Sequence, residues 1–194
     1  MIVGVKHLTW APYTSGGAGA AVVYGAGTMD KDLMVRVDMS EERNDTPFHA
    51  DDHRIDRDNS VNAATVALEL ARIPATMREP VLGHVAGSGT TPDYTVTEDA
   101  APYIGVGFML KERYKAVTKF RAFWYWKVQF SEGQRSFNTK GENLEFQTES
   151  LEGAVEAVQL TDGGKFEYYV YADFDTEAAA DTWLKGKGNV SGNQ

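Results

Sequence analysis

A short run of histidines and carboxylates holds the residues of this sequence best suited to bind a metal ion. His49, Asp51, Asp52 and His53 follow one another closely, and imidazole and carboxylate groups are ligands for zinc, manganese and iron. A catalytic metal also needs a formed cavity and groups that orient its ligands. Residues 41–60 are charged and nearly free of large apolar side chains. We therefore interpret the run as part of a solvated loop and predict neither a metal nor a cofactor.

Other motifs that carry chemistry are incomplete. The glycines of residues 15–19 are not followed by the Gly-Lys-Ser/Thr of a phosphate-binding loop, and residues 25–27 lead to Asp30 where a dinucleotide site has its third glycine. The chain has no cysteine, and neither His7 nor His84 lies near a Gly-x-Ser-x-Gly motif. We therefore predict that this protein is not an enzyme.

The composition is that of a globular, acidic protein. Of its 194 residues, 42% are hydrophobic and 24% are charged, and one domain of this size buries about 70% of the surface that its unfolded chain exposes. The net charge of −9 argues against binding to DNA phosphates, which requires clusters of Lys and Arg. The opening residues lack the layout of a signal peptide. No run of about eighteen apolar residues occurs, so we expect no membrane span.

Alternation of apolar and polar residues predicts several β-strands. The longest example spans residues 120–130, where one face is predicted to carry Phe120, Ala122, Trp124, Trp126, Val128 and Phe130. Further alternating segments are residues 33–39, 65–70, 144–147 and 151–157, and strands are also expected near 3–10, 104–110 and 166–171. The many aromatic residues fit this interpretation, because they favour pleated, half-buried surfaces.

Helices and loops account for the rest of the chain. Residues 73–82 allow a short helical turn between prolines, and residues 175–184 predict a helix that starts at Asp175 or Thr176 and stops at Gly186. The sequence thus predicts one mainly β domain over residues 1–194, with one or two short helices. We expect a long loop at 41–60 and a flexible tail at 186–194.

Six segments, taken in their order along residues 3–160, resemble the major tail protein family of long-tailed bacteriophages, whose members are tail tube proteins. The segments are Val5-Lys6-His7-Leu8 with Tyr13, then Ala50-Asp51-Asp52, Val66 to Ala71 running into Ile73-Pro74 and Leu82-Gly83-His84, Ala101 to Phe108, Phe123 to Phe130, and Thr139 to Glu142 running into Leu144 to Thr148. They have the character of strand cores and turns. The C-terminal portion departs from the family pattern, and no added immunoglobulin-like domain is evident.

The resemblance implies a structural protein of the virion. Its expected fold is a β-sandwich or barrel-like subunit with a short helix packed on it. Subunits of this family form hexameric rings, and the rings stack into the tube through which DNA is ejected into the host. The implied partners are other copies of the chain, together with the tape measure, terminator and distal tail proteins at the tube ends. The resemblance implies assembly in the host cytoplasm, and DNA that passes through the tube without specific binding.

Within this interpretation, two groups of residues have expected positions. The long loop is expected to contact the next ring through Phe48, His49, Asp51, Asp52 and Ile55. Strand alternation places a second, mostly acidic group away from the core, as candidates to line the lumen: Asp38, Glu69, Glu145, Gln147, Glu152 and Glu156. An acidic wall would not bind phosphates, because duplex DNA carries about one negative charge per 1.7 Å.

Two other functions remain open at this point. Residues 124–126, Trp-Tyr-Trp, could line the site of a carbohydrate-binding β-sandwich, although alternation favours core packing for both tryptophans. A metal hydrolase that uses His49 and His53 is the other alternative.

Overall fold

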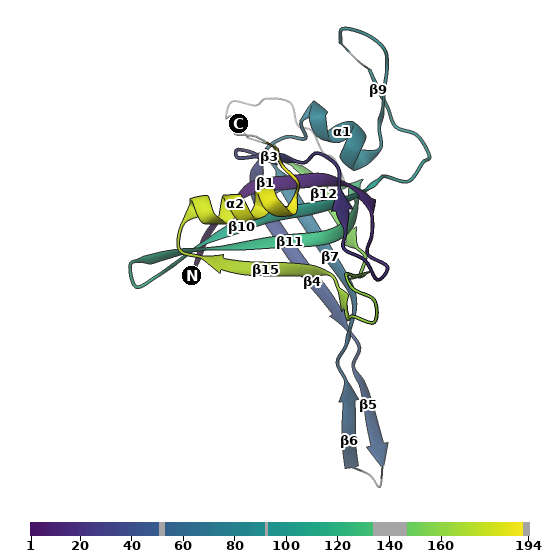
Figure 1. Ribbon diagram of the computed structural model, residues 1–194, viewed down its shortest axis with the longest axis vertical. Helices are drawn as coiled ribbons and strands as arrows, with labels where there is room; N and C mark the ends of the chain where they lie inside the picture. Colours follow the sequence, from purple (N-terminus) through teal and green to yellow (C-terminus); the bar gives the residue numbers. More distant parts are fainter. Residues whose placement is uncertain (51–52, 92, 134–146, 192–194) are drawn as a thin grey trace.

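The computed structural model describes residues 1–50, 53–91, 93–133 and 147–191. It is mainly β, with 54% strand and 12% helix, as the sequence predicts (Figure 1). The strands are β1 (Ile2–Ser15), β2 (Val23–Tyr24), β3 (Thr28–Asp30), β4 (Met34–Arg43), β5 (Thr46–Ala50), β6 (His53–Asp58), β7 (Val61–Leu70), β8 (Val85–Ala86), β9 (Tyr94–Thr95), β10 (Tyr103–Tyr114), β11 (Val117–Glu132), β12 (Glu149–Val155), β13 (Val158–Gln159), β14 (Phe166–Glu167) and β15 (Tyr169–Phe174). The helices are α1 (Ala75–Leu82) and α2 (Glu177–Lys187).

One antiparallel sheet of nine strands forms the body. Its main order is β2-β1-β10-β11-β12-β7-β4, with β3 also paired to β1 and β15 also paired to β11. The sheet curls, because β4 at its end contacts β1. It therefore encloses one face as a core and presents the other face of β12, β7 and β4 outward.

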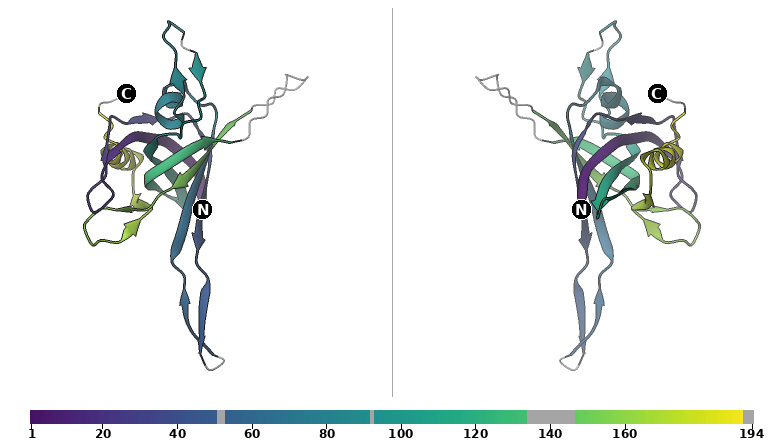
Figure 2. Two further views of the ribbon diagram at one scale, coloured as in Figure 1. Left: turned by 90° about the vertical axis from the view of Figure 1, so that its right-hand side faces the viewer. Right: turned by 90° about the vertical axis from the view of Figure 1, so that its left-hand side faces the viewer.

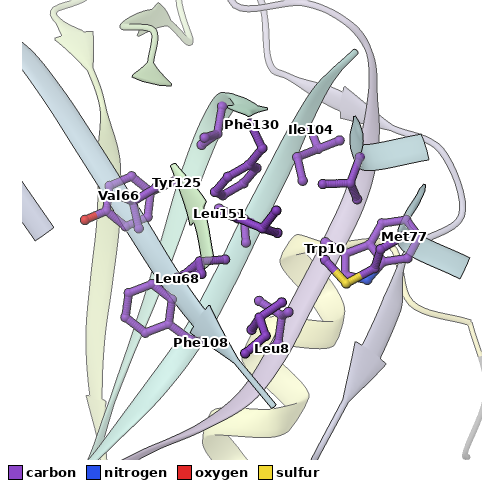
Figure 3. Close-up of a cluster of buried hydrophobic side chains, with 14 of the residues drawn as sticks. Leu8, Trp10, Val66, Leu68, Met77, Ile104, Phe108, Tyr125, Phe130 and Leu151 are labelled. Carbon is purple, nitrogen blue, oxygen red and sulfur yellow. The ribbon is translucent and has the colours of Figure 1, made fainter. Parts of the chain in front are cut away.

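The enclosed face carries the larger of two hydrophobic cores. Side chains from β1, β7, β10, β11, β12 and α1 point toward one another there, as Figure 3 shows: Leu8, Trp10, Val66, Leu68, Met77, Ile104, Phe108, Tyr125, Phe130 and Leu151. Each is at most 5% exposed. Full burial of one such aliphatic or aromatic side chain contributes about 1.5–3 kcal/mol.

The second core lies between the opposite face of the sheet and α2. It contains Trp124, Met109 and Leu184, which are all fully buried. Gly107 of β10 leaves space for this packing, because a Cβ atom there would lie 2.6 Å from the Trp124 ring and 2.8 Å from Leu184. Helix α2 thus packs against the sheet at Gly107 and Trp124.

Strand β11 contributes side chains to both cores. The prediction that six of its side chains share one face is therefore wrong. Opposite β10, Val106 pairs with Tyr125, but Ile104 pairs with Val128. One extra residue of β11 therefore lies between these pairs, which is a β-bulge. Residues 120, 122, 124 and 126 pack in the α2 core, whereas residues 128 and 130 pack in the enclosed core.

Strand β4 is less buried than its alternation predicts. Leu33, just before it, is buried and Val37 packs on the enclosed core. Val35 and Met39, however, are 49% and 43% exposed. These side chains are exposed because β4 ends the sheet, and among the described residues no strand is hydrogen-bonded to its outer edge.

Residues 41–60 are not a structureless loop, and that expectation is wrong. Strands β4 and β7 stay paired as far as Arg43 and Val61, and β5 pairs with β6 from Thr46 opposite Asp58 to Ala50 opposite His53. The segment is a long β-hairpin that leaves the body at the end opposite α1 (Figures 1 and 2). Cross-strand backbone hydrogen bonds join the two strands whatever their side chains are, so the hairpin forms without apolar alternation.

Helix α2 begins as predicted but ends later. Thr176 is its N-cap, and the Thr176 side chain accepts a hydrogen bond from the Ala179 amide at 3.3 Å. The helix passes Gly186, and the expected flexible tail at 186–194 is wrong for residues 186–191. Asn189 Nδ2 donates to the carbonyl oxygens of Tyr24 and Gly25 at 3.2 Å. Residues 192–194 lie outside the described part.

Candidate functional site

Two surface features stand out from the fold. The first is the hairpin of residues 41–60, here called the arm. The second is the face of β4, β7 and β12 that points away from the enclosed core, here called the outer face. Neither has the form of an enclosed catalytic pocket.

Among the residues that the structure describes, the strands of the arm pair only with each other. Strands β5 and β6 form a separate two-stranded sheet, and Figure 2 shows this hairpin extending well beyond the body. Phe48 and His49 lie on β5, Ile55 lies on β6, and His49 is opposite Arg54 in the ladder. Three of the expected contact residues thus lie on paired strands of a projection.

The candidate metal ligands of this segment are described only in part. Asp51 and Asp52 lie outside the described residues. Across the ranges that the structure covers, no group of three or more histidines and carboxylates could hold a metal ion.

A polar network fixes the root of the arm to β15. The Tyr169 hydroxyl donates to Glu41 Oε1 at 2.5 Å, and Arg43 Nη2 donates to Glu41 Oε2 at 2.6 Å. These bonds lower the pKa of the Glu41 carboxyl, with Tyr169 the larger cause. In return, the hydrogen bond to Glu41, followed by burial, raises the pKa of Tyr169 to about 12. Beside them, the Tyr168 hydroxyl donates to the Asn62 carbonyl at 3.1 Å.

The outer face brings together three of the candidate lumen residues. Asp38 on β4 is opposite Ala67 on β7, which is opposite Glu152 on β12. Glu69, two residues along β7, shares this face because Leu68 and Leu70 are buried on the other. The predicted alternation of β7 and β12 is confirmed.

Local partners differ among these acids. Asp38 pairs with Arg36 at 2.9 Å, and Glu69 accepts a hydrogen bond from Thr148 at 2.5 Å. Glu152 is exposed and has no ion pair among the described residues. Between the acids the surface is lined by small side chains, including Thr65 and the alanines at 63, 67 and 154.

The outer face is also hollowed. A concavity of about 590 Å³ lies between its strands and the segment that leads into β10. It is lined by Thr65, Ala67, Ala100, Gln129, Glu152 and Ala154, among others. Most of these side chains are short, since Thr65 and the three alanines are among them.

The remaining lumen candidates are placed differently. Gln147 is exposed just before β12, and Glu145 lies outside the described residues. Glu156 follows β12 and is neutralised, because Lys127 Nζ lies 2.5 Å from its Oε2 and the Tyr103 hydroxyl donates to Oε1. The pKa of Glu156 is lowered, first by Lys127 and then by Tyr103.

The aromatic run at 124–126 does not form a surface site. Trp124, Tyr125 and Trp126 are 0%, 1% and 8% exposed. The Trp124 indole donates to the Tyr24 hydroxyl at 3.1 Å inside the α2 core. Core packing of both tryptophans is therefore confirmed.

An ionic cluster around one buried histidine went unpredicted from the sequence. His7 is 6% exposed, and its Nδ1 and Nε2 lie 2.5 Å and 3.3 Å from Asp181 and Glu177 of α2. Lys6 and Lys31 flank the two carboxylates at 3.1 Å and 3.9 Å. The spacing of Glu177 and Asp181 on one helix face was readable from the sequence, but their partner on β1 was not.

A scan against protein-family models found no match to this chain, and a search of curated proteins also found none. Neither helix of the described part is long and apolar enough to cross a membrane.

Proposed function

We propose that this chain is the subunit of a bacteriophage tail tube. Copies associate into hexameric rings, the rings stack, and DNA leaves the virion through the lumen without specific binding. Other tail proteins would occupy the two ends of the tube. The proposal combines the family resemblance of the sequence with the shape and charge of the molecule.

The arm is the observation that carries this proposal. A two-stranded hairpin is marginal in water by itself, and this one projects from the body with no further strand partner in the described part of the chain. A projection of this kind gains stability when another molecule covers it. In a stack of rings the arm reaches the neighbouring ring, with Phe48, His49 and Ile55 on the strands that make the contact and Asp51 and Asp52 between them.

The outer face fits the lumen wall. It presents short side chains with the carboxylates of Asp38, Glu69 and Glu152. DNA and wall would lie within about one Debye length, roughly 8 Å at physiological salt, so their charges interact. A wall without basic clusters does not bind phosphates and lets the duplex slide.

Electron microscopy of the purified protein tests the proposal. Negative-stain images over a wide concentration range should show rings and hollow tubes, and analytical ultracentrifugation should show assembly that depends on concentration. A protein that stays monomeric at high concentration, and that is missing from phage particles, would rule the proposal out.

Deleting the end of the arm is the sharper experiment. Removal of residues 46–58, with Asp45 joined to Asn59 through a short turn, should leave the circular dichroism spectrum of the body unchanged. Rings should still form, and stacking into tubes should be lost. Tubes of normal length from the deletion variant would show that the arm does not make the inter-ring contact.

A further inference from the structure

One projection of the molecule is basic and apolar, in contrast to the acidic outer face. The β10–β11 hairpin extends past the body beside the N-terminal end of β1 (Figure 1). Ile2 of β1 pairs with Glu112 of β10. At the turn of the hairpin, Tyr114 of β10 pairs with Val117 of β11. Ile2, Tyr114 and Val117 are 60%, 69% and 56% exposed. Apolar side chains in such a group mark an interaction surface more often than isolated ones do.

The same hairpin carries cations that lack a carboxylate partner. Residues 111–119 hold four cationic side chains and one carboxylate, a net charge of +3 in a chain whose total is −9. The one carboxylate, Glu112, pairs with Arg121 at 3.3 Å. Lys111, Arg113 and Lys115 have no carboxylate partner within the described ranges, and Lys115 lies 5.3 Å above the Tyr114 ring. We call Ile2, Tyr114 and Val117 with these three cations the tip patch.

The last strand of the sheet has the complementary character. Val35 and Met39 are its exposed large apolar side chains. Residues 34–45 hold four carboxylates and two arginines, a net charge of −2. Glu42 is exposed and has no ion pair with any residue described. We call Val35, Asp38, Met39 and Glu42 the β4 rim, and an exposed edge strand of this kind is a surface that proteins normally cover.

We propose that the tip patch of one copy docks on the β4 rim of a second copy. Both surfaces carry exposed apolar side chains, and the net charges of their segments are opposite, which favours this pairing over tip to tip or rim to rim. The two surfaces differ, so the contact is heterologous and propagates to a ring or a filament. The inference rests on the proposed function, because it assigns this contact to neighbouring subunits of one ring.

Charge reversal tests the pairing. The tip variant Arg113→Glu, Lys115→Glu changes the net charge of residues 111–119 from +3 to −1, and the rim variant Asp38→Lys, Glu42→Lys changes that of residues 34–45 from −2 to +2. Each variant alone should need at least about tenfold more protein to assemble, because like charges then meet. Mixed in equal amounts they should assemble again, since each tip then meets a rim of opposite charge. Lys165→Glu, an exposed change outside both surfaces, is the matched control and should assemble like the wild type.

Cross-linking tests the contact even if no tube forms. The chain has no cysteine, so Lys115→Cys and Glu42→Cys each introduce a unique thiol. A short bis-maleimide should join the two variants as a dimer when they are mixed, and Lys165→Cys in place of Lys115→Cys should give none. Absence of tubes together with this dimer would contradict the proposed function and keep the docking contact.

Three results would overturn the contact itself. One is normal assembly of both charge-reversal variants, and another is failure of their mixture to recover while each remains folded by circular dichroism. The third concerns nucleic acid, because a basic patch with a tyrosine is also suited to phosphates and bases. Saturable binding of duplex or single-stranded DNA, lost in the tip variant while assembly is unchanged, would assign the patch to DNA.

Discussion

Nδ1 of the buried His7 lies 2.5 Å from Oδ1 of Asp181, and this pair joins the first strand of the sheet to the last helix. His7 also has a left-handed backbone, with φ at +57°, in the irregular stretch where β1 slips by one residue against β10. The bulge thus turns the imidazole toward α2. The N-terminal strand and the C-terminal helix are held together by one ionic cluster.

We expect Asp181→Asn to lower the free energy of unfolding by about 1–3 kcal/mol, because it removes a charged partner from a buried ring. Urea denaturation followed by tryptophan fluorescence measures the change. Asp175→Asn is the control. Asp175 is 85% exposed and pairs with Lys119 at the surface, so its change should stay within about 0.5 kcal/mol. Equal effects of the two substitutions would contradict a structural role for the His7 cluster.

Tyr169→Phe should weaken the root of the arm in a pH-dependent way. The folded pKa of Glu41 is depressed, chiefly by the Tyr169 hydroxyl, so this carboxyl stabilises the fold above its unfolded pKa of about 4.3 and loses that contribution as the pH falls through the folded pKa. We expect a loss of about 1 kcal/mol at pH 7. The gap between variant and wild type should narrow below about pH 4.

Denaturation at several pH values measures that gap, and hydrogen exchange of the β4 and β7 amides near Glu41 locates it. Tyr171→Phe is the matched control, because Tyr171 is 56% exposed on the same strand and Glu41 bonds to Tyr169 instead. A pH-independent gap for Tyr169→Phe would show that the ring, and not the hydrogen bond, holds the arm root.

Ala116→Gly should stabilise the β10–β11 turn. Lys115 and Ala116 both have positive φ, +47° and +66°, a conformation that glycine adopts without the steric cost of a Cβ. We expect a gain of about 0.5–1 kcal/mol in the free energy of unfolding. Gly163→Ala is the reverse control. Gly163 has a φ of +69°, and no atom lies near a Cβ added there. Backbone strain alone should therefore destabilise this variant, by a similar amount. A loss of stability in Ala116→Gly would mean that the Ala116 methyl makes a contact that outweighs the strain.

Glu69→Lys combined with Glu152→Lys should slow DNA ejection if the outer face lines a tube. Tubes should still form, because these side chains lie on the solvated side of β7 and β12. Basic groups there would bind phosphates, so the delay should be greatest at low salt. Ejection is followed by release of a DNA-binding dye. Asp162→Lys, outside the outer face, should leave the rate unchanged, and an equal delay in that control would remove the lumen assignment.

Some of this protein could be read from local sequence. The buried alternation of β7 and β12 was predictable, because a strand with one face in a core repeats every two residues whatever its partners are. Val66, Leu68, Leu70 and Leu151 follow that rule. The N-cap of α2 was also predictable, since capping by Thr176 depends on neighbouring residues only.

Other features depended on residues far apart in the chain. The bulge in β11 moves Val128 and Phe130 to the enclosed core, and it arises from hydrogen-bond register with β10, which the period of β11 does not encode. The segment after Gly186 is ordered because Asn189 bonds to the backbone of Tyr24 and Gly25. Such partners appear only once the chain has folded.

The two candidate functional surfaces were also predictable only in part from local sequence. Alternation placed Glu69 and Glu152 away from the core, but only the ladder through Ala67 and Ser150 puts them on one face with Asp38. The arm carries no regular apolar alternation, although its strands pair through the backbone, and its sequence therefore resembled a loop. Local sequence determined which side chains avoid the core, and tertiary pairing decided which of them share a surface, because strand register is a property of two segments together.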